Sequence, residues 1–320
     1  MFRNNLSIAV RSLAKNRLSA FLNITGLAVG VTATVLLALY AWYEWSFDRF
    51  HQHADRIVRV VFRAEMNGGV IKEPFAMPPV AATLKNDYPE VEEAGRLRVA
   101  GTQTIVQGEH FFRDVKMAFA DTALFHIFTF PLVHGATGKY FLPLHTVVLS
   151  ETLSKRLFGA GNPVGKVLHV KDWPEPLQVV AVMRDIPLNA HFQFDLFCSM
   201  ANARDAVSDS WMQSEFYTYL LLKKGTDPQH LESKLPATLD KYMGPQLLAG
   251  LGMTLAALKS KGDQIGLFLQ PLTDIHLHSD FNFDLRPAGD VRYVLLFATV
   301  AVFILFIACI NLHPKQISGL

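Results

Sequence analysis

The sequence predicts a membrane protein of the α+β class, in which two transmembrane helices flank one large extracytoplasmic domain. Three observations lead to this prediction. Two runs without a charged side chain, of twenty and eighteen residues, lie near the ends of the chain, at Ile24 to Tyr43 and at Tyr293 to Ile310. The 320 residues are 50% hydrophobic with a mean hydropathy of +0.21, which is high for a wholly soluble protein. The region between the runs carries two strand–helix–strand patterns, which suit an α+β sheet with its helices on one face.

The first run is long enough to cross a bilayer. At a rise of 1.5 Å per residue, twenty helical residues cover about 30 Å, the thickness of the hydrocarbon core, and a helix satisfies its own backbone polar groups there. We therefore predict a transmembrane helix over residues 18–44. A cleaved signal peptide is the alternative, but the run is longer than a signal-peptide core and no A-x-A cleavage site precedes Glu44. Trp42, Tyr43 and Trp45 lie where an interfacial aromatic belt is expected.

Charge predicts the direction of this helix. The first seventeen residues contain no acid and four basic side chains, namely Arg3, Arg11, Lys15 and Arg17. Because basic residues stay on the cytoplasmic side, the N-terminus is predicted to be cytoplasmic. Apolar residues recur at helical spacing in this stretch, so residues 1–17 are predicted to form an amphipathic helix on the membrane lipids, with a fraying basic tail as the alternative.

Small residues recur every four positions within the first transmembrane helix. They are Gly26, Gly30, Thr34 and Ala38. A stripe of this kind lets another helix approach closely, and we predict that these four residues pack against a neighbouring helix.

The second run predicts a transmembrane helix over residues 291–312, which returns the chain to the cytoplasm. Arg286, Asp290 and Arg292 precede it. The remaining residues, 313–320, are expected to be a short cytoplasmic tail. The first helix and its basic flank therefore dominate the predicted orientation.

Residues 45–290 lie between the two runs and are long enough for two domains. Two strand–helix–strand patterns bracket this region, at Arg56–Glu65, Met77–Tyr88 and Gly95–Val99, and again at Phe216–Leu222, Asp227–Tyr242 and Ile265–Gln270. Asp227 is expected to cap its helix. The stretch between the patterns predicts an inserted subdomain over residues 102–205, with strands at Thr104–Val106, Phe111–Phe119, Thr146–Leu149 and Gln178–Met183 and a helix at Glu151–Phe158.

Motifs that carry chemistry are weak in this sequence. The stretch AGNPVGKV, Ala160 to Val167, lacks the first glycine and the hydroxyl residue of a phosphate-binding loop and leads into a strand. Asp280, Asn282 and Asp284 alternate as in a calcium loop, but Leu285 replaces the required glycine, so a solvated loop is expected.

Two histidine pairs share a spacing that would place each pair on one face of a strand. They are His51 with His53 and His276 with His278. No third zinc ligand is evident, so packing or hydrogen bonding is the expected role and a zinc site the alternative. No motif of a hydrolase or metalloprotease occurs, and no basic patch for nucleic acid. We predict no enzyme activity, no catalytic, cofactor or metal site and no bound nucleic acid.

Seven segments occur in an order known from one protein family. They are RNNLSIAVRSLAKNRLSAFLNITGLAVG, EWSFDRFHQHADRIVRV, GNPVGKVL, VVAVMRDIPLNAHFQFD, YTYLLLKKG, PLTDIHLHS and FILFIACIN, and they cover residues 3–311. Together they resemble the MacB-like and FtsX-like ABC transporter permeases. The resemblance implies a multi-pass inner-membrane protein with a large periplasmic MacB-like core domain, made of a porter-like part at 45–101 and 206–290 and the inserted subdomain at 102–205.

The resemblance also implies a function in export, efflux or mechanotransmission. Family permeases couple a separate cytoplasmic ABC ATPase to movement of the periplasmic domain, and work as a pair of permeases with a pair of ATPases. They have four transmembrane helices, whereas this sequence stops after the second, so we expect a truncated fragment that grips its ATPase weakly. Two alternatives remain open: a two-span membrane sensor with a periplasmic ligand-binding domain, and an inactive remnant.

Overall fold

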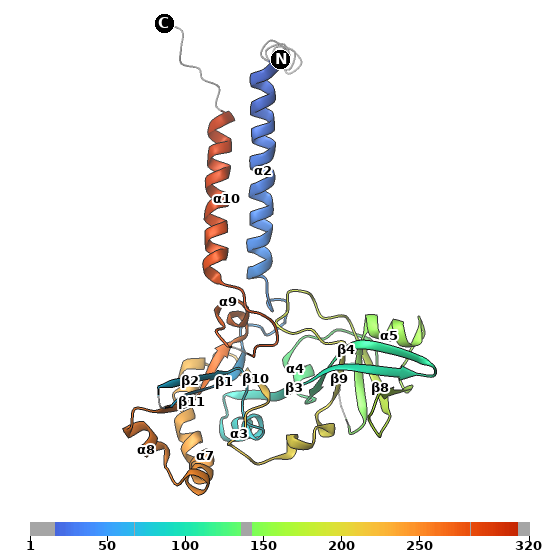
Figure 1. The fold of residues 1–320 in the computed structure, drawn as a ribbon, viewed down its shortest axis with the longest axis vertical. Helices are drawn as coiled ribbons and strands as arrows, with labels where there is room; N and C mark the ends of the chain where they lie inside the picture. Colours follow the sequence, from blue (N-terminus) through green and yellow to red (C-terminus); the bar gives the residue numbers. More distant parts are fainter. Residues whose placement is uncertain (1–16, 67, 136–142, 282, 313–320) are drawn as a thin grey trace. The chain divides into compact units, whose positions relative to one another are not determined.

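The computed structural model describes residues 17–66, 68–135, 143–281 and 283–312 (Figure 1). The predicted surface helix at 1–17 therefore lies outside the described residues except for Arg17, as does the predicted tail at 313–320. The chain divides into two compact units. The first combines Met1–Ser46 with Gly289–Leu320, and the second is Phe47–Ala288.

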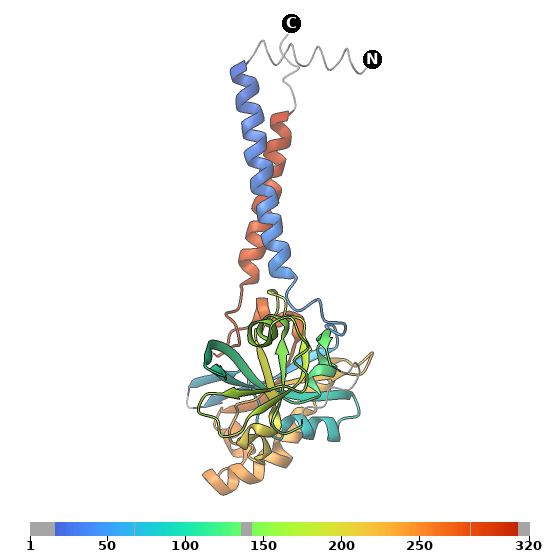
Figure 2. The ribbon, with the colours of Figure 1, turned by 90° about the vertical axis from the view of Figure 1, so that its right-hand side faces the viewer.

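The first unit consists of two long apolar helices that lie side by side (Figures 1 and 2), α2 (Arg17–Trp45) and α10 (Val291–Leu312). Both have the length and composition of membrane spans, with mean hydropathies of 2.0 over Phe21–Trp45 and 2.9 over Val291–Ile310. Val294, Ala301 and Ala308 recur every seven residues and form the buried face of α10. This heptad spacing is typical of two helices packed at a shallow angle. The other faces expose leucine, valine and phenylalanine, as lipid contact requires.

Six elements of the second unit form a βαββαβ pattern of the ferredoxin-like type. They are β1 (Ile57–Met66), α3 (Val80–Asp87), β3 (Val91–Gln107), β10 (Tyr217–Leu222), the helical pair α6 (Pro228–Glu232) and α7 (Leu235–Leu251), and β11 (Gln264–Pro271). The strands pair antiparallel in the order β11-β1-β10-β3. β1 and β3 are parallel to each other with β10 between them, and β10 and β11 are parallel with β1 between them, so the helices that join each pair are crossover connections.

One face of these four strands is covered by α3 and α7. Val58 and Val60 of β1 pack there with Leu84 of α3 and Leu239 of α7. The alternate residues of the same strands point to the opposite face, because side chains alternate along a strand. There Ile57 and Tyr219 join a second core with many aromatic rings, to which α4 (Leu124–Ile127) also contributes.

The sheet continues through residues of the middle of the chain into eleven strands among the described residues, in the order β11-β1-β10-β3-β4-β9-β6-β8-β5. The additional elements are β4 (His110–Ala120), β5 (Leu132–His134), β6 (Thr146–Ser150), α5 (Glu151–Phe158), β7 (Val167–Val170), β8 (Leu177–Met183) and β9 (Leu196–Ser199), with β2 (Gly69–Glu73) beside β1 and β7 beside β3 and β8. Short helices complete the unit: α8 (Leu255–Ser260), α9 (Ile275–His278), and three 3₁₀ turns at Met200–Asn202, Arg204–Val207 and Leu272–Asp274.

The mixed α/β architecture and the two flanking apolar helices are confirmed, and two details of the expected elements are wrong. The predicted separate strands Gly95–Val99 and Thr104–Val106 are one strand, β3, which runs without a break through position 102. Gly101 resembles a turn residue in the sequence, but it has φ +77° and lies at a register shift against β4, as in a β-bulge. The predicted helix Asp227–Tyr242 is divided into α6 and α7. Asp227 caps α6, as expected, by accepting a hydrogen bond from Gln229 N.

Candidate functional site

The candidate site comprises the two chain segments that join the folded unit to the helices α2 and α10, with the side chains that hold them. The first segment, 47–56, follows α2, and the second, 279–288, precedes α10. A loop between a membrane helix and a domain is expected to be exposed and mobile. Here each segment instead contributes a buried carboxylate to the interior of the unit, Asp48 from the first and Asp284 from the second.

Asp48 has no exposed surface, and its backbone is in the left-handed region at φ 59°. Aspartate tolerates this region better than most residues do. The Asp48 carboxylate accepts hydrogen bonds from His191 N, at 3.1 and 3.2 Å, and lies 2.8 Å from His191 Nδ1. The backbone N–H of Asp48 donates to Asn189 O at 2.9 Å. The turn after α2 is thereby fastened to the loop at residues 189–191.

A tyrosine of the central sheet completes this chain of hydrogen bonds. His191 Nε2 lies 2.7 Å from the Tyr219 hydroxyl. Burial raises the pKa of Tyr219 well above its ordinary value, so the hydroxyl stays protonated and donates to Nε2. Nδ1–H of His191 then donates to Asp48, which as a carboxylate can only accept. The first segment is thus connected through two side chains to strand β10.

His51 lies beside this group and is 4% exposed. Its Nδ1 accepts a hydrogen bond from Thr129 N at 3.0 Å, which places the ring proton on Nε2. Nε2 is 3.9 Å from Asp48 Oδ1 and has no hydrogen-bond partner in the described part of the chain. Burial lowers the pKa of His51 to about 4, although the charge of Asp48 acts in the opposite direction. His51 is therefore neutral at physiological pH.

The second segment is held by a buried ion pair. Arg59 of β1 has no exposed surface, and its guanidinium donates to both carboxylate oxygens of Asp284, at 2.6 and 2.9 Å. It also donates to Gln270 Oε1 at 2.7 Å. Burial acts to raise the pKa of Asp284, but the hydrogen bonds and charge of Arg59 outweigh it, and the pKa is lowered. Both groups remain charged, which makes this the strongest polar attachment of the segment.

Three further hydrogen bonds attach the second segment to the rest of the unit. The Tyr217 hydroxyl donates to Phe283 O at 2.6 Å. Arg286 donates to two backbone carbonyls of the neighbouring loop, Leu188 O at 2.6 Å and Ala190 O at 3.0 Å. Because residues 188–191 also hold Asp48, both connecting segments share one loop as an anchor. The two connecting segments and this loop form one hydrogen-bonded assembly beside β1 and β10.

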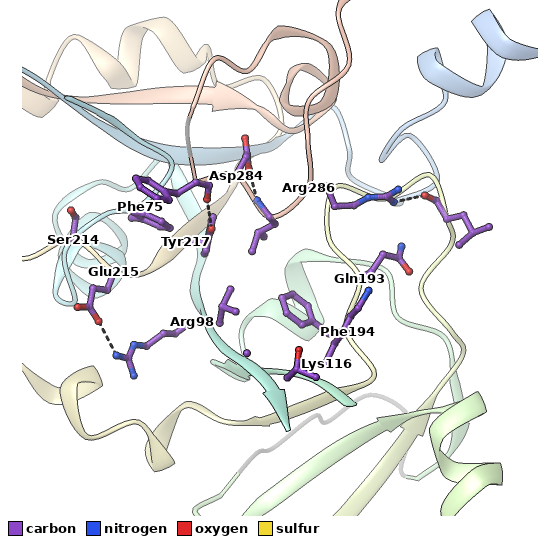
Figure 3. A pocket seen from close by; sticks show the side chains of 16 residues that line it. Phe75, Arg98, Lys116, Gln193, Phe194, Ser214, Glu215, Tyr217, Asp284 and Arg286 are labelled. Carbon is purple, nitrogen blue, oxygen red and sulfur yellow. Dashed lines mark hydrogen bonds and ion pairs between the residues drawn. The ribbon is translucent and has the colours of Figure 1, made fainter. Parts of the chain in front are cut away.

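The second segment borders a groove of about 980 Å³, shown in Figure 3. Phe75 and Tyr217 line it beside Asp284, and Lys116 and Phe194 line it from the neighbouring strand and loop. Arg98 is held at the rim by Glu215, at 2.8 Å, and by Asp205, at 2.7 Å. Residues 283–286 of the second segment all line this groove.

The structure places the predicted packing stripe as follows. Gly30 faces α10, where an added Cβ would lie 3.3 Å from Ala308 Cβ. Thr34 Oγ1 donates to Gly30 O at 2.9 Å and lies 3.4 Å from Ala301 O. A Cβ on Gly26 would meet nothing within 4 Å, and Ala38 is exposed. Of the basic residues predicted to lie at the membrane surface, Arg17 is exposed, while Arg3, Arg11 and Lys15 are outside the described residues.

The two histidine pairs do not lie on strands, so the condition under which each pair would share a strand face is not met. His51 belongs to the turn after α2, and His276 and His278 to α9. His276 stacks on Phe47 with ring centroids 3.4 Å apart, which is a packing role. No cluster of three metal-ligating side chains occurs in the described ranges.

Two other sequence motifs also have structural partners. Asp280 pairs with Lys72 and Asp284 with Arg59, so these carboxylates are neutralised separately; Asn282 lies outside the described residues. The AGNPVGKV stretch leads into β7, as expected, and Lys166 Nζ lies 5.2 Å from the Phe158 ring centroid. Beside this lysine, Lys166 N donates to Pro163 O at 2.9 Å and Gly165 N donates to Val179 O at 2.8 Å.

A family model described as the MacB-like periplasmic core domain matches residues 20–238. The chain belongs to this family. The match begins within α2 and reaches into α7, so it includes the first connecting segment and most of the sheet. With the two apolar helices, it makes the chain a membrane protein with an extracytoplasmic domain of the ABC transporter permease family. No curated protein matches the chain.

Solved structures are similar to this chain, and the first of them, with a TM-score above 0.5, shares its fold. A domain of a protein described as a permease from Porphyromonas gingivalis is 19% identical with a TM-score of 0.58, covering 77% of this chain and 98% of that one. The periplasmic region of MacB from Actinobacillus actinomycetemcomitans is 13% identical with a TM-score of 0.41, covering 68% and 90%. The extracellular domain of a noncanonic ABC-type transporter, YknZ, from Gram-positive bacteria is 10% identical with a TM-score of 0.41, covering 67% and 99%.

Sequence reasoning missed the residues that hold the connecting segments. One signal was present: Arg59 is flanked two positions away by Ile57 and Val61, so it shares a strand face with apolar side chains. A charge on an apolar face is expected to be buried and paired. Its partner Asp284 is 225 positions away along the chain, and no spacing in the sequence connects the two.

Proposed function

We propose that this chain is the transmembrane subunit of an ABC-type export or mechanotransmission system, and that it couples a separate cytoplasmic ATPase to movement of its extracytoplasmic domain. Family membership and the two span-length helices support the class of protein. The attachment of both connecting segments supports the coupling itself. We further propose that the chain is not an enzyme and binds no ATP.

The proposal rests on one observation: both connecting segments are held to the folded unit by buried polar contacts. The segment after α2 is held through Asp48 and His191, and the segment before α10 through Arg59 and Asp284. Breaking a buried charge pair costs about 3–5 kcal/mol, far more than thermal energy. A displacement of α10 is therefore transmitted to the sheet through the Arg59–Asp284 pair, and a displacement of α2 through the hydrogen bonds of the buried Asp48 carboxylate.

The family supplies the remaining parts of the proposal. The chain lies in the inner membrane with its N-terminus in the cytoplasm and residues 45–290 in the periplasm, and it works beside a second permease. The basic residues Arg3, Arg11, Lys15 and Arg17 contact anionic lipid, each contributing on the order of 1 kcal/mol. Cysteine labelling of intact cells tests the orientation: Gly225→Cys should react from outside and Asn4→Cys should not.

The coupling is tested by measuring a distance across the groove while the ATPase changes state. Thr102→Cys and Phe283→Cys place spin labels at two residues that line the groove, in a background in which Cys309 is changed to serine and the buried Cys198 is kept. Membranes containing the chain with its cognate ABC ATPase are compared without nucleotide, with ATP, and with ATP and vanadate. We expect the distance distribution to change with nucleotide. Identical distributions in all three states, with the ATPase still bound, would contradict the proposal.

A further variant separates coupling from binding. Asp284→Asn removes the charge that holds the second segment but leaves the helices unchanged. The nucleotide-dependent change in distance should shrink, while the amount of ATPase that co-purifies stays the same. Lys155→Met, at an exposed ion pair on α5, is the matched control and should leave the change intact.

A further inference from the structure

The groove in Figure 3 is lined by large apolar side chains that remain exposed to solvent. Leu188 is 73% exposed, Phe283 65% and Val99 44%, and all three line the groove. They belong to the loop at residues 188–191, to the second connecting segment and to β3. Exposed apolar side chains that gather in a depression with polar groups around it mark a binding site for a ligand or a partner.

Aromatic rings provide much of the remaining apolar surface. The Phe75 ring packs edge-on against Tyr217, with centroids 4.8 Å apart, and its centroid is 6.5 Å from that of Phe283. Phe194 contributes a further ring from the loop before β9 (Figure 3). The volume of about 980 Å³ and this lining are typical of sites for small molecules, which combine apolar and aromatic walls with a few polar groups. A ligand with a ring or an alkyl chain can therefore pack on these side chains.

Three of the five charged side chains that line the groove already have ion-pair partners. Arg98 lies 2.8 Å from a carboxylate oxygen of Glu215 and 2.7 Å from one of Asp205. Asp284 is bound by Arg59. Because Arg98 has two carboxylate partners, that end of the groove does not attract an anion. Arg98, Glu215 and Asp284 therefore do not select the charge of a ligand.

The other two charged residues that line the groove, Lys116 and Arg286, are basic. Lys116 is exposed, and its ammonium group has no hydrogen-bond or ion-pair partner among the described residues. Asp195 accepts a hydrogen bond from the backbone N–H of Lys116, at 2.9 Å, but does not line the groove. The guanidinium of Arg286 donates to two neutral carbonyl oxygens and has no carboxylate partner in the described part of the chain. Two positive charges at the groove thus lack an ion-pair partner, which favours an acidic ligand.

We propose that this groove binds a small amphipathic anion, that is, a molecule with an aromatic or alkyl body and one acidic group. Its body packs on Phe75, Phe194 and Phe283, and its acidic group lies at Lys116. The ligand therefore contacts the second connecting segment, which contributes Phe283. This binding needs neither the ATPase nor a nucleotide, so it goes beyond the function proposed above and is tested separately from it.

The probe is para-benzoylbenzoate, a water-soluble aromatic carboxylate that cross-links to neighbouring C–H bonds under near-ultraviolet light. The full chain is held in nanodiscs of phosphatidylcholine, without ATPase, and the cross-linked residues are located by mass spectrometry of peptides. The uncharged amide of the probe is the ligand control. We expect saturable labelling of residues that line the groove, Phe283 and Leu285 among them, and an affinity for the amide that is about twofold to fivefold lower.

Substitutions at two exposed positions test the acidic group and its place in the groove. Lys116→Gln should weaken binding of the probe about twofold to fivefold, which is the usual effect of an exposed ion pair, whereas Lys116→Arg should retain it. Val99→Glu adds a carboxylate to the groove and should weaken binding by a similar factor relative to the neutral Val99→Gln. Lys155→Met, at an exposed ion pair on α5, should leave binding unchanged. Near-ultraviolet circular dichroism checks that each variant keeps its fold.

The acidic group can belong to a free molecule or to a membrane lipid, and the composition of the nanodisc separates these two sources. If added phosphatidylglycerol reduces saturable labelling by the probe, the groove binds the anionic lipid. If labelling is unchanged, the site is assigned to an anion free in solution. Both results support an amphipathic anion as the ligand.

Four results would overturn the proposal. The first is equal labelling by the probe and its amide, because the acidic group would then not be recognised. The second is saturable labelling confined to residues outside the groove, and the third is labelling that saturates nowhere, because the groove would then not be the site. The fourth is unchanged binding in both Lys116→Gln and Val99→Glu. Spin-label distances that do not respond to nucleotide would contradict the coupling but leave this test unaffected.

Discussion

Neutralising Asp284 tests how strongly the connecting segment before α10 is held. In Asp284→Asn, the guanidinium of Arg59 stays buried but loses the charge that compensates it. Removing one partner of a buried ion pair costs about 3–5 kcal/mol. For a domain of 150–250 residues, 1 kcal/mol corresponds to about 2–4 °C in Tm, so the Tm of the folded unit should fall by roughly 6–20 °C.

The structure predicts that removing Arg59 and removing Asp284 lower the unfolding free energy by different amounts. Arg59 has no exposed surface, whereas the Asp284 side chain is 6% exposed and borders the groove of Figure 3. In Arg59→Met the remaining carboxylate keeps its bond to Leu285 N, at 3.0 Å, and can reach water. We therefore expect Arg59→Met to cost less than Asp284→Asn, and the double variant to be more stable than Asp284→Asn alone.

The assay is thermal unfolding of the full chain in detergent, followed by near-ultraviolet circular dichroism, which reports the aromatic core of the folded unit. Lys155→Met, at an exposed pair on α5, is the control and should shift Tm by less than about 2 °C. If Asp284→Asn also lowered Tm by less than about 2 °C, the reasoning would be refuted. Such a result would mean that solvent or other groups compensate the charge of Arg59.

Three further predictions concern other parts of the chain. Gly30→Leu should reduce disulfide cross-linking between cysteines placed on α2 and α10, at a cost of roughly 1–2 kcal/mol, whereas Gly26→Leu, which has open space, should not. The pKa of His51 is lowered to about 4 in the fold and is about 6.5 in the unfolded chain. The unfolded chain therefore takes up a proton first as the pH falls, and about 3 kcal/mol of the unfolding free energy that is present above pH 6.5 is lost by pH 4. His51→Gln should flatten the dependence of the unfolding free energy on pH over this range. Asp227→Ala removes the cap of α6 and should lower the unfolding free energy by about 1 kcal/mol in urea titrations.

Local patterns in the sequence were sufficient for the class of protein and for most elements. An uncharged run long enough to cross a bilayer identifies both long helices, because composition and length decide that property without any partner. The strand at Ile57–Met66 and the helix at Glu151–Phe158 follow from alternation and from helical spacing. Gly101 shows the limit of such patterns, since a glycine that ends a strand and one that forms a bulge look alike until the neighbouring strand is in place.

The attachment of the connecting segments was decided only by the tertiary structure. Asp48 meets His191 and Arg59 meets Asp284 because the sheet order β11-β1-β10-β3 brings distant parts of the chain together. Gly26 and Gly30 have the same local sequence signal, and only the position of α10 distinguishes them. Secondary structure is encoded in neighbouring residues, whereas a buried charge acquires its partner through topology.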